Sequence, residues 1–215
     1  MKKDIRTWRS QYAGELLDET LVASHPFTQF DTWFQEAVSA NVIEPHAVVL
    51  ATANENGLPS ARVVLLKAFG KEGFTFYTNY NSHKGKDLET NPQGSLLFFW
   101  PQLHRQVRIS GEVLKTSREE SEAYFSERPR ESRISAWVSP QSSVVASRAA
   151  LEEKHKTLEA EYSGRDIPFP DFWGGYCLKP TVFEFWQGQA NRLHDRVLYS
   201  LEAATDTWKI ERLAP

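Results

Sequence analysis

Beyond Pro45 the hydrophobic residues of this chain recur at every second position, and short polar turns separate the alternating segments. Because successive side chains of a strand point to opposite faces, this period predicts β-strands. Antiparallel strands with short connections and inserted helices favour a small barrel over a doubly wound parallel sheet. The predicted strands are Ala47–Ala53, Ser60–Lys67, Phe74–Thr78, Gly94–Trp100, Arg105–Lys115, Tyr176–Gln187, Arg192–Tyr199 and Thr207–Leu213.

Helical signals lie before and between these strands. Aromatic residues at helical spacing predict a helix over Pro26–Ala40, and Ser82 is placed to cap a helix that ends near Thr90. A capping-box spacing predicts a helix over Ser117–Glu127, and a charged helix is expected over Ser147–Tyr162. We expect one domain over residues 1–215, with an N-terminal arm of about twenty residues.

Composition excludes several classes of partner. The formal net charge of −3 over 215 residues argues against a nucleic-acid-coating protein. The single Cys177 excludes an intramolecular disulfide and a multi-cysteine metal site, which favours a reducing compartment. No apolar run approaches the roughly 20 residues that a bilayer span needs. We therefore expect a cytoplasmic protein without metal, nucleic-acid or membrane partners.

Several catalytic motifs are absent from the sequence. There is no G-x-G-x-x-G for a nicotinamide site and no G-x-x-x-x-G-K-[ST] for a P-loop. H-E-x-x-H and G-x-S-x-G are also missing, which weakens metalloprotease and hydrolase interpretations.

The segment Glu184–Arg196, EFWQGQANRLHDR, predicts a β-hairpin with its turn at Gly188–Asn191. Strand alternation then puts Arg192, His194 and Arg196 on one face. Bringing two guanidiniums to an imidazole costs free energy unless a ligand compensates them. The pattern predicts a site for a planar, anionic ligand, and the alternative is a solvated edge strand.

Other cations lie beside hydroxyls and amides. Ser82-His83-Lys84 opens a helix, a natural seat for a phosphate. Tyr124, Arg128 and Ser132 are four apart and predict a second phosphate site, although Pro129 is expected to end the helix between them. Gln106 suits recognition of a heterocycle edge, and Gln141-Ser142 is a candidate contact loop. Arg62 and Lys67 are either further contacts or ordinary charged strand ends.

Long motifs then show a resemblance to the pyridoxamine 5′-phosphate oxidase family, which uses FMN to make pyridoxal 5′-phosphate. The motifs span nearly the whole chain. They are Arg62-Val-Val-Leu-Leu-Lys67, Phe76-Tyr-Thr-Asn79, Arg105-Gln-Val107, Tyr124-Phe-x-x-Arg-Pro-Arg130, Gln141-Ser-Ser143, Trp173-Gly-Gly175, Glu184–Arg196 and Glu211-Arg-Leu-Ala-Pro215.

The resemblance implies a split β-barrel homodimer with FMN at the subunit interface. His83 stands where the family often has an arginine. The implied substrate contacts are Arg9, Tyr12, Lys67, Tyr124, Arg128, Ser132, Arg192 and His194, with Arg192 and His194 as the catalytic pair. The implied FMN contacts are Arg62, Val63, Val64, Leu65, Leu66, Lys67, Tyr77, Thr78, His83, Lys84, Gln106, Gln141, Ser142, Trp186 and Arg196.

The resemblance also implies a reaction. The 4′ carbon of pyridoxine or pyridoxamine 5′-phosphate gives a hydride to the flavin, and dioxygen reoxidises the flavin and yields hydrogen peroxide. Arg196 is the candidate to stabilise negative charge on the reduced flavin. The alternatives are another flavin split-barrel reductase and a non-catalytic protein that binds FMN or pyridoxal phosphate.

Overall fold

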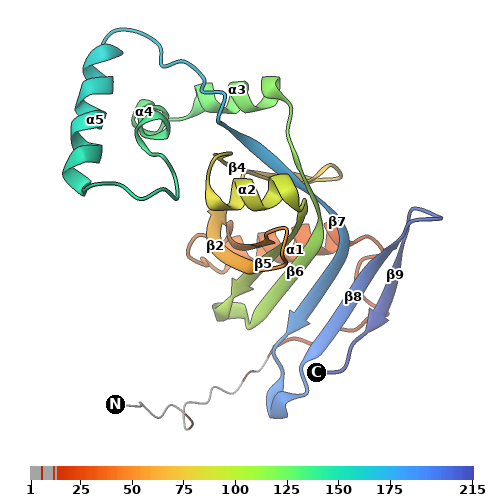
Figure 1. The fold of residues 1–215 in the computed structure, drawn as a ribbon. Helices are drawn as coiled ribbons and strands as arrows, with labels where there is room; N and C mark the ends of the chain where they lie inside the picture. Colours follow the sequence, from red (N-terminus) through yellow and green to blue (C-terminus); the bar gives the residue numbers. More distant parts are fainter. Residues whose placement is uncertain (1–5, 7–11, 13) are drawn as a thin grey trace. The chain divides into compact units, whose positions relative to one another are not determined.

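The computed structural model describes residue 6, residue 12 and residues 14–215 (Figure 1). Strands dominate the described part, and helices precede them or are inserted between them, as the sequence predicts. Arg9, which the resemblance places at the substrate, lies outside the described residues. Within those residues, no helix is long and apolar enough to cross a membrane.

Within the described residues, nine strands form one sheet. Neighbours follow the order β2-β1-β5-β6-β7-β4-β3, while β8 pairs with β7 and β9 pairs with β8. The bounds lie within a few residues of the predicted strands. They are β1 Ala47–Ala53, β2 Pro59–Leu65, β3 Ala68–Gly70, β4 Gly73–Asn79, β5 Gln93–Trp100, β6 Arg105–Lys115, β7 Trp173–Gln187, β8 Asp195–Glu202 and β9 Thr207–Arg212.

Strand β7 is fifteen residues long and, besides its neighbour β6, pairs with β4 and β8 over different parts of its length. Its first part, from Trp173 to Leu178, pairs with β4. Its last part, Val182 to Gln187, pairs with β8, and Trp186 lies opposite Arg196. One strand therefore carries both the Trp173-Gly-Gly motif and the start of the Glu184–Arg196 segment.

Helix α1, Pro26–Ser39, lies within one residue of its predicted range. The Nδ1 atom of His25 accepts the backbone N–H of Phe27 and caps the helix. Phe30, Trp33 and Ala37 recur on one face and are buried. The aromatic residues of this helix are core residues.

Four further helices follow. Ser82 caps α2, His83–Thr90, and Ser117 caps α3, Arg118–Glu127, both as predicted. Helix α5, Arg148–Glu161, matches the charged helix. Helix α4, Arg130–Val138, was not predicted. Single 3₁₀ turns occur at Pro101–Leu103 and Ala190–Arg192.

The chain divides into two compact units. The first holds the N-terminal part through Val49, together with Ser95–Ser110 and Pro180–Pro215. The second holds Leu50–Gly94 and Gly111–Lys179. Strands β1, β5, β6 and β7 contribute residues to both units.

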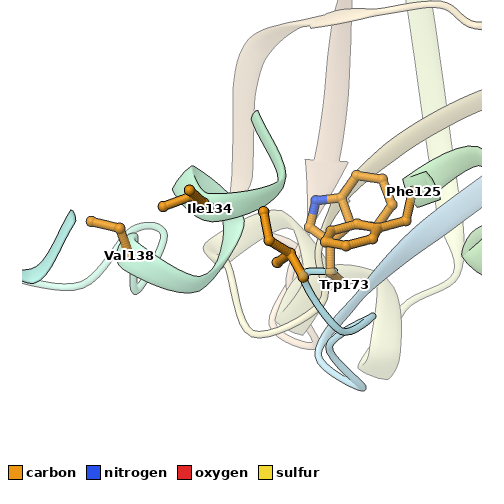
Figure 2. Packing of buried hydrophobic residues seen from close by; sticks show 5 residues of the cluster. Phe125, Ile134, Val138 and Trp173 are labelled. Atoms are coloured by element: carbon orange, nitrogen blue, oxygen red, sulfur yellow. The ribbon is translucent and has the colours of Figure 1, made fainter. Parts of the chain in front are cut away.

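Helix α4 forms because its few apolar residues all face one cluster. Ile134 and Val138, one turn apart, pack with Phe125, Ile167 and Trp173 in the second unit (Figure 2). All five side chains are buried. Burial of large apolar side chains is worth about 1.5–3 kcal/mol each, which is enough to order this polar segment. The helix therefore depends on tertiary packing.

The chain turns between Gly70 and Gly73, and the short strand β3, which was not predicted, pairs Phe69 with Phe74. One local prediction is wrong. Strand β8 was expected to begin at Arg192, but it begins at Asp195. Asn191 and Arg192 have φ of 55° and 62°, which a strand does not accommodate.

Candidate active site

A pocket of about 550 Å³ in the second unit gathers half of the cofactor and substrate contacts that the resemblance implies. Strands β2 and β4, helices α3 and α4 and the loop at Gln141 supply its walls. Its lining includes Val63, Val64, Leu65, Lys67, Tyr77, Thr78, Lys84, Tyr124, Arg128, Ser132 and Gln141. Residues from the two predicted anion sites thus share one cavity.

Lys84 is a buried cation in this pocket, with 7% of its surface exposed. Its Nζ lies 3.1 Å from Thr78 Oγ1, 3.3 Å from Ser82 Oγ and 3.2 Å from Gln141 Oε1, all neutral acceptors. Burial, and then repulsion from Arg62, lower the pKa of Lys84 to about 8. An anion bound here would stabilise the protonated amine.

Elsewhere in the pocket lining, Arg128 lies against a stack of aromatic rings. Tyr77 and Tyr124 are stacked with ring centroids 4.0 Å apart, and Trp173 stacks on Tyr77 at 5.6 Å. The guanidinium carbon of Arg128 lies 4.5 Å from the Trp173 ring centroid. One of its nitrogens, NH1, is buried without a hydrogen-bond partner. Such an orphaned donor indicates a missing acceptor.

Burial also shifts the pKa values of Arg128 and Tyr77. It lowers the pKa of Arg128, which Tyr124 opposes, although a guanidinium remains charged at neutral pH. Burial and the nearby Glu120 carboxylate raise the pKa of Tyr77, whose hydroxyl donates to Glu120 Oε1 at 3.2 Å. The Tyr77 phenol therefore stays neutral.

The helix break at Pro129 brings Ser132 to the pocket. Helix α3 ends at Glu127, as Pro129 predicts, and α4 begins at Arg130. Tyr124, Arg128 and Ser132 still line the same cavity. Their shared direction therefore comes from the break between two helices, not from one continuous helix.

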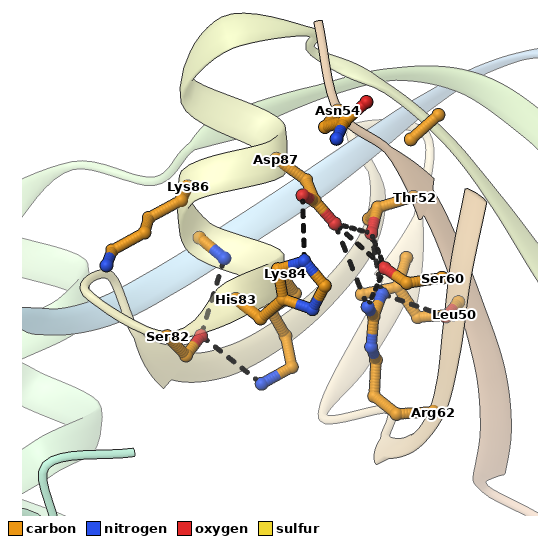
Figure 3. Close-up of polar contacts among 12 residues, drawn as sticks. Leu50, Thr52, Asn54, Ser60, Arg62, Ser82, His83, Lys84, Lys86 and Asp87 are labelled. Carbon is orange, nitrogen blue, oxygen red and sulfur yellow. Dashed lines mark hydrogen bonds and ion pairs between the residues drawn. The ribbon is translucent and has the colours of Figure 1, made fainter. Parts of the chain in front are cut away.

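Four of the implied FMN contacts in this unit are not part of the lining. Leu66 is buried, and Ser142 is exposed with φ of 70°. Arg62 and His83 instead point toward Asp87 of α2 (Figure 3). Sequence reasoning missed Asp87, although its position four residues after His83 is a helical pairing signal.

The first unit holds the remaining predicted residues. Arg192 is exposed in the 3₁₀ turn, and His194 precedes the first residue of β8. The prediction that Arg192, His194 and Arg196 share one strand face is therefore wrong. The left-handed backbone at Asn191 and Arg192 replaces the strand geometry on which that prediction depended.

An aromatic cluster surrounds His194. Its ring lies 4.8 Å from that of Trp186 and 5.7 Å from that of Tyr12. Tyr12 also contacts Trp186 and His104 edge-on. The backbone N–H of Gln189 donates to His194 Nδ1 at 3.1 Å. The structure thus brings Tyr12 and His194 into contact.

Arg196 is paired in this structure. Its Nε donates to Glu184 Oε1 at 2.9 Å, and its NH1 donates to the Ala214 carbonyl at 2.7 Å. Glu184, which is buried, also pairs with Arg108. Gln106 is half-buried on β6 in the same unit. Sequence reasoning missed the Glu184 partner, which balances part of the Arg196 charge.

The pocket fits a phosphorylated, planar ligand. Among the described residues, the hydrogen-bond partners of Lys84 Nζ are all neutral, and Arg128 NH1 is buried without a partner. A buried cation without a counter-ion is costly, and an anion removes that cost. The Tyr77 and Tyr124 rings offer flat apolar surface beside both cations. The donor set therefore suits phosphate groups attached to aromatic rings.

The sequence matches two family models. Residues 34–160 match the model described as pyridoxamine 5′-phosphate oxidase. Residues 173–215 match the pyridoxine 5′-phosphate oxidase C-terminal dimerisation region. A relative named pyridoxine/pyridoxamine 5′-phosphate oxidase from Trichormus variabilis is 49% identical over 215 residues, which is the whole of both chains. One of the same name from Burkholderia thailandensis is 51% identical and covers 96% of this chain and 97% of its own.

Solved structures give the same fold. PhzG from Burkholderia lata, in complex with tetrahydrophenazine-1-carboxylic acid, superimposes with a TM-score of 0.88 at 30% identity, covering 96% of this chain and all of its own. A pyridoxamine 5′-phosphate oxidase-related, FMN-binding protein from Nostoc punctiforme has a TM-score of 0.69 at 18% identity, over 89% and 98% of the two chains. These similarities confirm the split-barrel fold class.

Proposed function

The chain belongs to the pyridoxamine 5′-phosphate oxidase family, and from that premise we propose that it oxidises pyridoxine or pyridoxamine 5′-phosphate to pyridoxal 5′-phosphate. Its cofactor is FMN. The observation that carries the proposal is the pair of uncompensated cations, Lys84 and Arg128, in one aromatic-walled pocket. The proposed reaction needs two phosphates, one on the cofactor and one on the substrate.

Lys84, Thr78 and Gln141 are proposed to hold the FMN phosphate, and Arg128, Tyr124, Ser132 and Lys67 the substrate phosphate. The chemistry that bound FMN supplies is acceptance of a hydride from the substrate's 4′ carbon, followed by electron transfer to dioxygen and release of hydrogen peroxide. Fixing the substrate by its phosphate orients the reacting carbon, which lowers the entropic cost of the reaction.

Arg192 and His194 are proposed as the substrate clamp. The Gln189 N–H holds the His194 imidazole through Nδ1, so Nε2 is available to a ring substituent. Trp186, whose ring is tilted against the imidazole, and Tyr12, which meets it edge-on, restrict the imidazole further. Arg192 is exposed, so its guanidinium is free to be ordered by an anionic ligand. The homodimer with FMN at the subunit interface and the cytoplasmic location complete this proposal.

A turnover assay tests the proposed reaction. FMN-loaded protein is mixed with pyridoxine 5′-phosphate or pyridoxamine 5′-phosphate in air, and oxygen uptake, aldehyde and peroxide are followed together. We expect all three to change in step, and Arg192→Met to lower kcat/KM at least about tenfold through loss of a charge-assisted contact. Wild-type kcat/KM in that variant would refute the clamp.

One comparison suggests a second candidate activity, which is oxidation of a tricyclic acid without a phosphate. The similar PhzG structure holds a tetrahydrophenazine acid, which carries no phosphate. The buried, unpartnered nitrogen of Arg128 argues for a phosphorylated substrate here. Unphosphorylated substrates in the same assay separate the two. Turnover of a tricyclic acid without turnover of either vitamin phosphate would favour the second activity, and FMN binding without any turnover would indicate a carrier.

A further inference from the structure

Asp87 is the most buried acidic side chain of α2, the helix that carries Lys84. It is not among the predicted cofactor or substrate contacts. It lies on α2, one turn after His83, and only 3% of its surface is exposed. Its Oδ2 accepts hydrogen bonds from Thr52 Oγ1 at 2.6 Å and from Ser60 Oγ at 2.9 Å. Its Oδ1 lies 3.6 Å from His83 Nε2 (Figure 3).

The same two hydroxyls also hold Arg62. Its NH1 donates to Thr52 Oγ1 at 2.7 Å and to the Leu50 carbonyl at 3.2 Å. Its NH2 donates to Ser60 Oγ at 2.5 Å and lies 3.8 Å from Asp87 Oδ2. Asp87 and Arg62 are therefore joined twice, each time through one hydroxyl.

The direction of these hydrogen bonds depends on Asp87. A guanidinium only donates, and each hydroxyl has a single proton to give. Because both hydroxyl protons go to Asp87, the lone pairs of Thr52 and Ser60 are left to accept from Arg62. Burial opposes ionisation of Asp87, but Thr52, Ser60, His83 and Arg62 together hold its pKa below the usual range. The carboxylate is thus ionised and acts only as an acceptor.

We propose that Asp87 is a positioning residue that fixes the Arg62 guanidinium for the FMN phosphate. The inference rests on the proposed function, which assigns Arg62 to the cofactor. Arg62 keeps its Nε–H and one NH2 proton without a hydrogen bond in the described residues. A guanidinium held on one edge presents its remaining donors in a fixed direction, so a phosphate orders fewer side-chain torsions on binding.

The direction of the change in FMN affinity tests the proposal, because direct repulsion of the phosphate by Asp87 would act opposite to the positioning of Arg62. A carboxylate near a phosphate site repels the phosphate, and its loss would then tighten FMN binding. Here Asp87 faces two cationic or ionisable partners, Arg62 and His83, and Lys84 lies on the preceding turn of the same helix. The charge of Asp87 is therefore matched locally, and its geometric effect on Arg62 dominates.

The experiment is a double-mutant cycle on FMN affinity. Apo-protein is titrated with FMN, and the dissociation constant is obtained from quenching of flavin fluorescence. Asp87→Ala should weaken FMN about tenfold, the effect of losing a charge-assisted anchor. The same change in an Arg62→Ala background should have no further effect, because Asp87 acts through Arg62.

Conservative variants separate position from charge. Asp87→Asn keeps an oxygen for both hydroxyls, so it should retain affinity within about threefold of the wild type. Ser60→Ala, which removes one hydroxyl and keeps the carboxylate, should weaken FMN only when Arg62 is present, and it carries the test if Asp87→Ala does not fold. Glu89→Gln, at an exposed position of α2, is the matched control and should change nothing.

Four results would overturn the proposal. Tighter FMN binding in Asp87→Ala would show repulsion, and equal weakening with and without Arg62 would show an independent effect. Unchanged FMN affinity in Asp87→Ala, with Arg62→Ala still weakened, would remove Asp87 and leave the cofactor assignment of Arg62 intact. Unchanged affinity in Arg62→Ala itself would refute both that assignment and the positioning role. Thermal unfolding of each variant is measured alongside, since a purely structural Asp87 would shift Tm without the Arg62 dependence.

Discussion

Lys84 gives the pocket its pH dependence. Its pKa is lowered to about 8, chiefly by burial, so a fraction of the protein has a neutral amine under mildly alkaline conditions. Phosphate binding favours the protonated amine, so the contribution of Lys84 to affinity should be constant below about pH 7 and fall as pH rises through 8. We expect FMN affinity to drop about tenfold between about pH 7 and about pH 9.

Fluorescence titrations across this range measure the effect. Lys84→Arg keeps a cation that does not titrate, so its affinity should stay level over the same range. The apo-protein should show the opposite trend in stability, because its folded state binds fewer protons than the unfolded state above pH 8. A wild-type affinity that stays level up to about pH 9 would contradict the role of Lys84.

Arg128 should discriminate substrates by their phosphate. Its guanidinium is buried, and NH1 has no hydrogen-bond partner. Arg128→Ala should raise KM for pyridoxine 5′-phosphate by about 10- to 100-fold, the value of one or two charge-assisted hydrogen bonds. The KM for unphosphorylated pyridoxine should change little. Arg148→Met, at an exposed position, is the control. Equal effects on both substrates would refute the assignment.

Individual elements show which sequence signals were reliable. The caps at Ser82 and Ser117 are local signals, because a hydroxyl satisfies N–H groups two or three residues away, and both helices begin where predicted. Helix α4 was missed because its stability comes from Ile134 and Val138 packing on the distant Trp173. The start of β8 was missed because left-handed backbone at Arg192 has no sequence signature.

The candidate site likewise contains residues that the sequence predicted and partners that it did not. Motif residues such as Lys84, Arg128 and Ser132 do line one pocket. Their partners were not predictable from spacing, because Asp87 meets Arg62 and Glu184 meets Arg196 only through the register of strands and helices. A residue's type thus indicated its chemistry, while its counter-ion required the fold.

Asp195 ties the segment after Tyr12 to the C-terminal strands. Its carboxylate accepts the Leu17 N–H at 3.2 Å, Gln189 Nε2 at 2.9 Å and Arg212 NH1 at 2.8 Å. Burial of this carboxylate is outweighed by these bonds, which lower its pKa. We expect Asp195→Ala to reduce the free energy of unfolding by about 2–4 kcal/mol.

Denaturant unfolding measures the loss, and hydrogen exchange at the Leu17 amide reports its location. Because the folded pKa is lowered, the contribution is present above the unfolded value and disappears as pH falls through the folded pKa. The difference between variant and wild type should therefore shrink in acid. Asp31→Ala, on the exposed face of α1, should leave stability nearly unchanged. A loss that does not depend on pH would contradict this explanation.

The whole molecule is proposed to act as a dimer. Residues 173–215 match a dimerisation region, and this range includes the whole of β7, β8 and β9. If FMN lies at the subunit interface, cofactor and partner bind in a linked equilibrium. Dilution of the FMN-loaded protein should then release flavin and dissociate the dimer over the same concentration range.

Sedimentation velocity, read at the flavin absorbance and at the protein absorbance, measures both events. Added FMN should shift the dissociation of the dimer to lower protein concentration, since the ligand stabilises the state that it binds. Release of FMN at a concentration where the protein remains fully dimeric would place the cofactor away from the interface.

Trp173 should also allow anion binding in the pocket to be detected by tryptophan fluorescence. The Arg128 guanidinium lies 4.5 Å from its ring centroid, and Tyr77 and Tyr124 complete the stack. An anion that draws the guanidinium off the indole changes the electric field at the ring, which shifts its emission. Colourless inorganic phosphate would therefore report occupancy of the Arg128 position without flavin, and Trp173→Phe would identify the signal among the other tryptophans. Trp173, which packs the cluster, would in this way serve as a spectroscopic sensor for the substrate end of the proposed reaction.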